Sequence, residues 1–448
     1  MLTNDQARER ATDLVARAMK AGADAADVIY VADASTGVQV RLGALEDVQR
    51  SEGEEIGLRV FIGRQSASAS SSDLSVAAMD ALAERAVAMA GEAPEDEFAG
   101  LAPEALLMRG AIADLDIDDH QDVAPQTLRD RALAAEDAAR AVAGVTNSEG
   151  GSASAGRAVV ALATSTGFSG SYSGSSHGVS ASVLAGEGSA MQRDYAYHSV
   201  RHLSDLDDAA AIGREAGEKA VARLNPIKLK SGPMTVIMDP RVGGSLIGHL
   251  IGAITGSAIA RKTSFLLDAL GQSVFGAGIT IIDDPHLQRG LRSKPFDGEG
   301  LPTQRRAIIE DGRLTTWLLD AASARQLGLS PTGHAARGVG GPPGAGASNL
   351  HMAAGPLSPT ELMADIREGF YVTELIGQGV NGLTGDYSRG ASGFVIRNGT
   401  LAEAVAEVTI AGNLKDMFHN LTPANDLVFR YGTNVPTLRI EGLTLAGD

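Results

Sequence analysis

Residues 242–260 read VGGSLIGHLIGAITGSAIA, a run of nineteen positions without a charged side chain. Arg241 precedes the run and Arg261 follows it. Within it, glycine occurs at 244, 248, 252 and 256, so it recurs at every fourth position. Four-residue spacing aligns side chains along one face of an α-helix. The run therefore predicts a helix whose glycine face lets another backbone approach closely.

A membrane-spanning helix is the alternative, because the run approaches spanning length and contains GxxxG spacing. Its glycines, two serines, a threonine and His249 dilute its hydrophobicity, and no second candidate span exists. We therefore expect a buried, closely packed helix. The glycine face is compatible with internal packing and with a subunit contact or the wall of a peptide cleft. His249 is compatible with a hydrogen-bonded core residue and with a functional one.

The composition narrows the class of protein. The chain has 448 residues, 44% of them hydrophobic, which is enough for two or three domains. Its 38 basic and 55 acidic residues give a net charge of −17, which argues against non-specific nucleic-acid binding. Cysteine is absent, which excludes disulfides, thiolate zinc ligands and a cysteine nucleophile. The charged, amphipathic N-terminal segment does not resemble a signal peptide.

The order of predicted elements indicates an α+β fold with two domains. In residues 1–225, helical patterns at 4–21, 74–91, 125–143 and 206–224 alternate with strand-like runs, without the rhythm of a doubly wound sheet. This predicts a mixed sheet with helices. Pro226 lies in the proposed boundary, and the strand at 234–239 begins the half 226–448. There, short strands and glycine turns predict a curled or barrel-like antiparallel sheet with the buried glycine-rich helix at 243–260.

Three short motifs are incomplete in this sequence. Residues 174–178 (GSSHG) match the nucleophile elbow GxSxG, but strand-like sequence on both sides favours a strand. His198 and His202 have the spacing of a zinc helix, but they are predicted as ordinary surface residues because DYAYHSV favours a strand. The acidic run DLDIDD (114–119) lacks the glycine and glutamate of a calcium loop, so we expect a solvated loop.

Two further segments contain chemically active side chains. Asp297 and Glu299 resemble a catalytic carboxylate pair, but a tight exposed turn also explains them. The glycine-rich run 377–393 contains Asn381 and then Asp386, Tyr387, Ser388 and Arg389. One reading is a peptide-cleft or interface segment in which Asp386 and Arg389 fix a bound strand. The other is a hairpin in which those two residues pair with each other.

The second half of the chain resembles the TldD/PmbA family, and specifically the PmbA or TldE branch, also labelled "modulator of DNA gyrase". The resemblance is carried by MQRDYAY (191–197), GHLIGAITGSAIARKTSFLLDALG (248–271), PFDGEGLPTQRRAIIEDG (295–312), SARQLGLSPTGHA (323–335), VTELIGQGVNGLTGDYSRGASGF (372–394) and the segment 409–417. These stretches occur in the family's order.

The resemblance implies a degenerate metal motif. TldD-type members resemble zinc peptidases with an HExxxH helix and a C-terminal cysteine ligand. Here the two histidine positions correspond to Gly248 and Ala253, the glutamate position to His249, and Gly252 lies between them. A catalytic zinc needs about three protein ligands. We therefore expect no metal site and no catalytic residue in this chain.

The resemblance further implies a non-catalytic subunit of a heteromeric TldD/TldE-type metallopeptidase that acts on unfolded or leader peptides. Its expected partner is a TldD-type subunit, which would hold the zinc, and its expected compartment is the cytoplasm. No direct nucleic-acid or membrane contact is expected, and a homodimer of the isolated chain remains open. The alternative is an independent hydrolase with an unrecognised active site.

Overall fold

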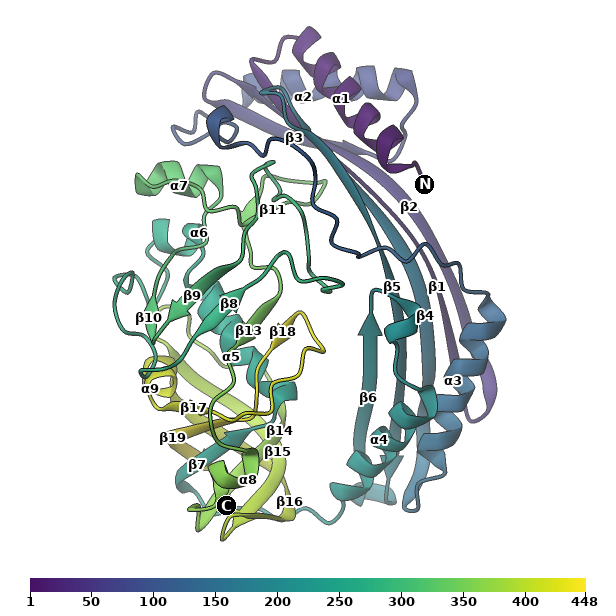
Figure 1. Cartoon of the computed structure of the whole chain (residues 1–448), viewed down its shortest axis with the longest axis vertical. Helices are drawn as coiled ribbons and strands as arrows, with labels where there is room; N and C mark the ends of the chain where they lie inside the picture. The colour runs from purple at the N-terminus through teal and green to yellow at the C-terminus, as the bar shows by residue number, and fades with distance from the viewer.

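The computed structural model describes all 448 residues, and it is an α+β fold. The N-terminal part is built on one antiparallel sheet of six strands. In spatial order the strands are β3 (Gln65–Ser71), β2 (Ala44–Ile62), β1 (Ala25–Arg41), β4 (Val145–Thr164), β5 (Ser169–Ala185) and β6 (Gln192–Val200). Several strands are long, and together they form a curved wall along the molecule (Figure 1).

Four helices cover the convex face of this sheet. They are α1 (Asn4–Lys20), α2 (Val76–Glu92), α3 (Pro125–Arg140) and α4 (Ala209–Ala222). The first begins with a capping box between Thr3 and Gln6, as their spacing predicts. Alternate residues of β1, such as Val28 and Tyr30, pack beneath α1 and α2. The helices therefore leave the concave face to the C-terminal part (Figure 1).

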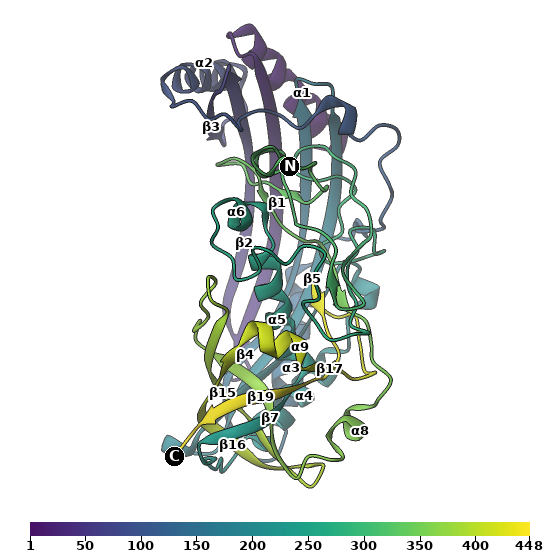
Figure 2. The same cartoon turned by 90° about the vertical axis from the view of Figure 1, so that its left-hand side faces the viewer.

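The C-terminal part contains a sheet that closes on itself. The strands β16 (Thr400–Asn413), β15 (Asp386–Arg397), β14 (Glu368–Ile376), β7 (Gly232–Met238) and β19 (Leu438–Ala446) lie in that order, and β16 also pairs with β19. The short strand β17 (Leu421–Pro423) continues the sheet beyond β19. The prediction of a barrel-like sheet is confirmed, although the pair β7–β14 is parallel rather than antiparallel. Figure 2 shows this sheet at the lower end of the molecule.

Smaller elements complete the C-terminal part. A second sheet has the order β10 (Arg313–Leu314), β9 (Arg306–Glu310), β8 (Ile281–Asp283), β13 (Leu350–Met352) and β18 (Thr433–Asn434). A two-stranded hairpin joins β11 (Ala335–Ala336) and β12 (Gly344–Ala345). The helices of this half are α5 (Pro240–Ala253), α6 (Gly256–Ala260), α7 (Ala321–Leu327), α8 (Pro359–Met363) and α9 (Leu414–His419).

Hydrophobic packing separates into clusters. The largest draws only on residues from Leu229 to Leu445, and the next draws on residues from Ala7 to Ala163. A smaller cluster joins Ile29 and Leu162 to Phe296 across the two parts. The division at 225/226 stays a prediction. No helix of the structure is long and apolar enough to cross a membrane, and the compartment of the protein stays a prediction as well.

Candidate functional site

The helix predicted over 242–260 is two helices, so the prediction of one continuous helix is wrong. The first, α5, begins at Pro240, with Asp239 Oδ1 accepting a hydrogen bond from the Arg241 amide at 2.9 Å. After Ala253 the backbone pairs with Leu318, whose amide donates to Ile254 and whose carbonyl accepts from Gly256. Because these groups bond outside the helix, α6 starts anew at Gly256.

The four glycines at every fourth position have different surroundings. A Cβ at Gly256 would lie 2.2 Å from the Ser323 hydroxyl, so this glycine permits the close packing of α6 on α7. A Cβ at Gly244 would make only ordinary contact with Thr433. Gly248 and Gly252 are exposed and would meet nothing within 4 Å. Close internal packing therefore explains Gly256, whereas Gly248 and Gly252 form an open face of α5.

The three motif positions do not fit a catalytic zinc ion. Gly248 has no side chain to donate, and Ala253 is buried toward the core. His249 lies between them without a second ligand, since no group of three or more His, Cys, Asp or Glu side chains could hold a metal ion anywhere in the structure. Any chemistry at α5 therefore depends on groups other than a bound zinc ion.

Three buried polar atoms without a hydrogen-bond partner gather beside α5. They are His249 Nε2, the Tyr387 hydroxyl and Arg389 Nε. Tyr387 and Arg389 project from the same face of β15 because they are two residues apart on a strand. The rings of His249 and Tyr387 meet edge to face with centroids 6.1 Å apart. Water, peptide or partner groups could satisfy these atoms.

The protonation states in this cluster favour binding of an acceptor. Burial lowers the pKa of His249, and the charge of Arg389 lowers it further. Burial raises the pKa of Tyr387 to about 12, although Arg389 opposes the rise. At neutral pH the cluster therefore presents a neutral imidazole, a phenol and a guanidinium. Such a set suits a peptide carbonyl or a carboxylate.

The rest of the predicted interface segment does not join this cluster. Asp386 accepts hydrogen bonds from Thr384 at 2.6 Å and from Asn413 at 3.1 Å, so the alternative in which it pairs with Arg389 is wrong. Strand alternation explains this result, because residues 386 and 389 lie on opposite faces of β15. In the turn that precedes β15, Asn381 Oδ1 accepts a hydrogen bond from the Leu383 amide at 2.9 Å. Ser388 is exposed, on the same side as Asp386.

A small cavity of about 260 Å³ lies beside the cluster and extends it toward the N-terminal sheet. Its lining includes Arg389 of β15, Ser245 of α5 and Tyr195 of β6. Arg241 also lines the cavity, and its Nη1 contacts Asp194 Oδ1 at 2.6 Å. Burial would raise the pKa of Asp194, but the bonds and charge of Arg241 hold it below its ordinary value. This ion pair fixes β6 against the start of α5.

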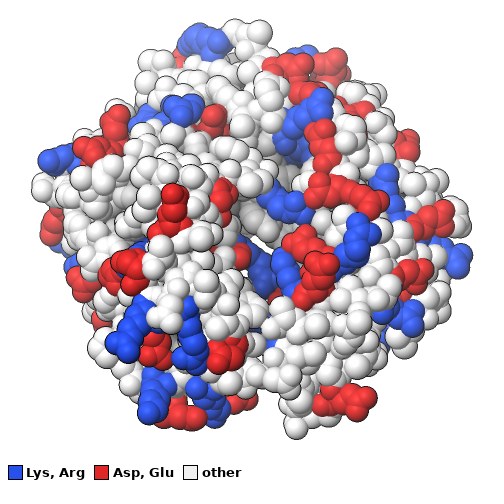
Figure 3. All heavy atoms as spheres, turned by 60° about the horizontal axis from the view of Figure 1, so that its bottom comes forward, with Lys and Arg blue, Asp and Glu red and all other residues white.

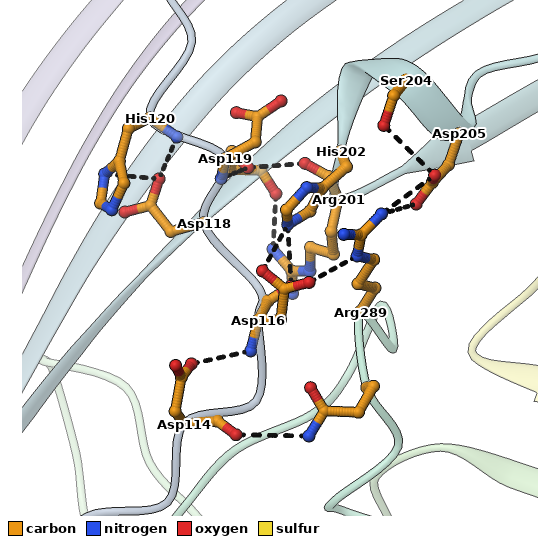
Figure 4. Close-up of polar contacts among 12 residues, drawn as sticks. Asp114, Asp116, Asp118, Asp119, His120, Arg201, His202, Ser204, Asp205 and Arg289 are labelled. Carbon is orange, nitrogen blue, oxygen red and sulfur yellow. Dashed lines mark hydrogen bonds and ion pairs between the residues drawn. The ribbon is translucent and has the colours of Figure 1, made fainter.

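The acidic run 114–119 is not a solvated loop, which corrects the prediction. It crosses between the two parts of the chain and is fixed by ion pairs and hydrogen bonds (Figure 4). Asp116 binds Arg289 at 2.6 Å, and Asp119 binds His177 Nε2 at 2.9 Å. The Asp119 side chain is only 2% exposed. Burial favours the neutral form of Asp119, but the Leu203 amide and other donors hold its pKa below the ordinary value.

The histidine and serine motifs also have structural roles. His198 lies on β6 and its ring contacts Asp207, whereas the His202 ring donates toward the Asp116 carbonyl at 2.9 Å. These rings have different partners, and both are largely buried, so the prediction of surface residues is wrong. Residues 174–178 continue strand β5 without a helix, so no nucleophile elbow forms.

Asp297 and Glu299 are buried, which corrects the prediction of an exposed turn. Asp297 accepts hydrogen bonds from the amides of Glu299, Leu301 and Ala335, so it holds the turn together. Burial raises the pKa of Asp297 despite these bonds. Burial also raises the pKa of Glu299, to about 7. Sequence reasoning missed their burial because the partners come from residues 321 and 335.

Family models match most of the chain. The models for the PmbA/TldA metallopeptidase match as domain 1 at residues 26–90, as the central domain at 118–224 and as the C-terminal domain at 231–447. The metalloprotease PmbA of Escherichia coli O157:H7 is 39% identical over 95% of this chain and 93% of its own length. The chain belongs to the PmbA/TldD family.

Other PmbA/TldD-family proteins agree with this assignment. A metalloprotease PmbA homologue of Haemophilus influenzae is 37% identical, over 98% of this chain and 96% of its own length. A Bacteroides thetaiotaomicron structure described as a modulator of DNA gyrase has a TM-score of 0.92 at 28% identity, covering 100% of both chains. TldE of Thermococcus kodakarensis has a TM-score of 0.88 at 20% identity, covering 98% of this chain and 100% of its own. At that identity, the TldE match supports the shared fold.

Proposed function

We propose that this chain is a non-catalytic subunit of a TldD/TldE-type heteromeric peptidase acting on unfolded or leader peptides. One observation carries the proposal: the helix at the family's motif position presents Gly248, His249 and Ala253, which cannot hold a catalytic zinc. The zinc is expected in a TldD-type partner. The names of the curated relatives support a peptidase family.

The open face of α5 is the proposed contact for peptide or partner. Gly248 and Gly252 leave its backbone accessible, and the cluster of His249, Tyr387 and Arg389 supplies donors beside it. A bound strand needs backbone partners and a few fixed side-chain groups, and this face offers both. A nucleic-acid role has less support, because acidic and basic side chains are intermixed on the face in Figure 3 and the net charge is −17.

The proposal is tested by assaying cleavage of an unstructured peptide. The chain is assayed alone, with a TldD-type subunit, and with a chelator. We expect cleavage that requires the partner and is abolished by the chelator. Chelator-resistant cleavage by the chain alone would instead support an independent hydrolase. Stoichiometric zinc in the isolated chain would contradict the reading of residues 248–253.

Two variants locate the contact. Gly248→Trp places a large side chain on the open face, where a Cβ meets nothing, so the chain should fold and the pair should lose activity. Val76→Trp is the control, since Val76 is exposed on α2, on the other side of the N-terminal sheet. Equal activity of both variants in the complex would exclude this face as the contact.

A further inference from the structure

A second cavity lies away from α5 and β15, between the concave sheet face and loops of the C-terminal part. Its volume is about 630 Å³, within the range of small-molecule sites. The hairpin of β11 and β12 reaches toward the sheet at this level (Figure 1). None of the lining residues belongs to α5 or β15. The cavity is therefore separate from the motif helix.

The floor of the cavity is apolar and ordered by strand register. Ile29, Val31 and Asp33 project from the same face of β1 because they are two residues apart. In the neighbouring strand, Gly57 pairs with Ile29, and Glu55 pairs with Val31. The apolar lining is completed by Val160, Leu162, Tyr172, Phe296 and Val339. The floor therefore runs from apolar residues to carboxylates along the strand.

A close backbone contact shapes one end of the cavity. A Cβ on Gly57 would lie 2.2 Å from the Val339 carbonyl oxygen, so only glycine lets the loop rest on the sheet there. Phe296 packs edge to face on Tyr172 with ring centroids 5.4 Å apart. These contacts close the cavity around Ile29.

The closed end has cationic donors with unused hydrogen-bonding capacity, beside the Asp297 carboxylate, whose oxygens already accept hydrogen bonds from backbone amides. The Arg337 side chain is 1% exposed, and its Nη1 pairs with Asp27 Oδ1 at 2.6 Å. Its Nε has no hydrogen-bond partner. Lys294 donates one hydrogen bond, to the Ala335 carbonyl at 3.3 Å, although an ammonium has three donors. Burial lowers the pKa of Lys294.

The open end has carboxylates without a basic partner. Asp33 is exposed, and Glu55 accepts a hydrogen bond from Ser70 at 2.6 Å. The ion pairs of the cavity region lie at its other end, where Asp27 binds arginines. A positive charge on a ligand would therefore be favoured at the open end.

We propose that this cavity binds short zwitterionic peptides with apolar side chains, of two or three residues. The ammonium group binds at Glu55 and Asp33, the side chains lie on the apolar floor, and the carboxylate accepts from Arg337 and Lys294. The lengths are similar, because the four residue-to-residue steps from Ile29 to Asp33 span about 13 Å and an extended tripeptide spans about 10 Å. This site is independent of the proposed contact at α5.

Calorimetry with the full chain tests the site, with Leu-Phe-Leu as the probe. The N-acetylated and the C-amidated forms of the same tripeptide are compared with it. We expect each blocked form to bind at least about tenfold more weakly, since each loses a charge-assisted contact. Equal binding of the free and blocked forms, or no binding of the free form, would overturn the proposal.

Variants assign the two ends of the ligand. Glu55→Gln should weaken the free tripeptide about tenfold and leave the N-acetylated form unchanged. Lys294→Met should weaken the free tripeptide about tenfold and leave the C-amidated form unchanged. This substitution spares the ion pair of Arg337 with Asp27. Asp47→Asn is the control, because Asp47 is exposed on the same strand as Glu55 but outside the cavity. Wild-type affinity in both cavity variants would refute the assignment.

Discussion

Replacing Glu299 with glutamine should stabilise the protein at alkaline pH. The side chain of Glu299 is 3% exposed, and its Oε2 accepts a hydrogen bond from the Ala321 amide at 2.7 Å. Arg59 is its nearest cation, at 3.8 Å from Oε1. Burial is the main reason why its pKa rises to about 7. Glutamine keeps an oxygen acceptor for Ala321 and removes the charge.

The size and sign of the effect follow from the pKa of Glu299. Its ordinary pKa is 4.5, and the value in the fold is about 7. At about 1.4 kcal/mol for each tenfold change, ionising the buried group costs the fold about 3 kcal/mol. Because the folded pKa is the higher one, no cost exists below about pH 4.5, and it grows as the pH rises toward 7. The full cost applies at pH 8.

Urea unfolding of wild type and Glu299→Gln, followed by circular dichroism at pH 4.5 and pH 8, measures this difference. The variant should gain about 3 kcal/mol at pH 8 and little at pH 4.5. Glu187→Gln, at an exposed position, is the control for charge removal. A gain that is the same at both pH values, or a loss at pH 8, would refute the reasoning.

Three other predictions concern packing and polar groups. Gly256→Ala should lower the free energy of unfolding by about 1–3 kcal/mol because its Cβ would collide with α7. Gly252→Ala should raise it by up to about 1 kcal/mol, because the helix gains an alanine at a position with open space. Thermal unfolding of the two variants compares these effects. Asp194→Asn should cost about 3 kcal/mol, seen in the urea midpoint, because it leaves Arg241 buried without its ion pair. Tyr387→Phe should raise the melting temperature of the isolated chain, since it removes a buried hydroxyl without a partner; a fall would show that this hydroxyl is satisfied.

The candidate site was only partly predictable from the sequence. The resemblance placed the motif at Gly248, His249 and Ala253, but spacing alone treated the glycines as equivalent. Their difference depends on what lies opposite each one: Ser323 faces Gly256, and nothing faces Gly248. The pairing of Asp386 with Arg389 was wrong because the segment is a strand, whose alternation separates them.

The sequence by itself determined the α+β class and the positions of the long helices, and the family resemblance then indicated which residues replace the zinc ligands at the motif. These properties depend on local periodicity and residue identity, which a single chain displays directly. The tertiary structure decided the break at Ile254, the burial of Asp297 and Glu299, and the gathering of His249 with Tyr387 and Arg389. Each of these results depends on a partner distant in sequence, and burial and electrostatics act through space.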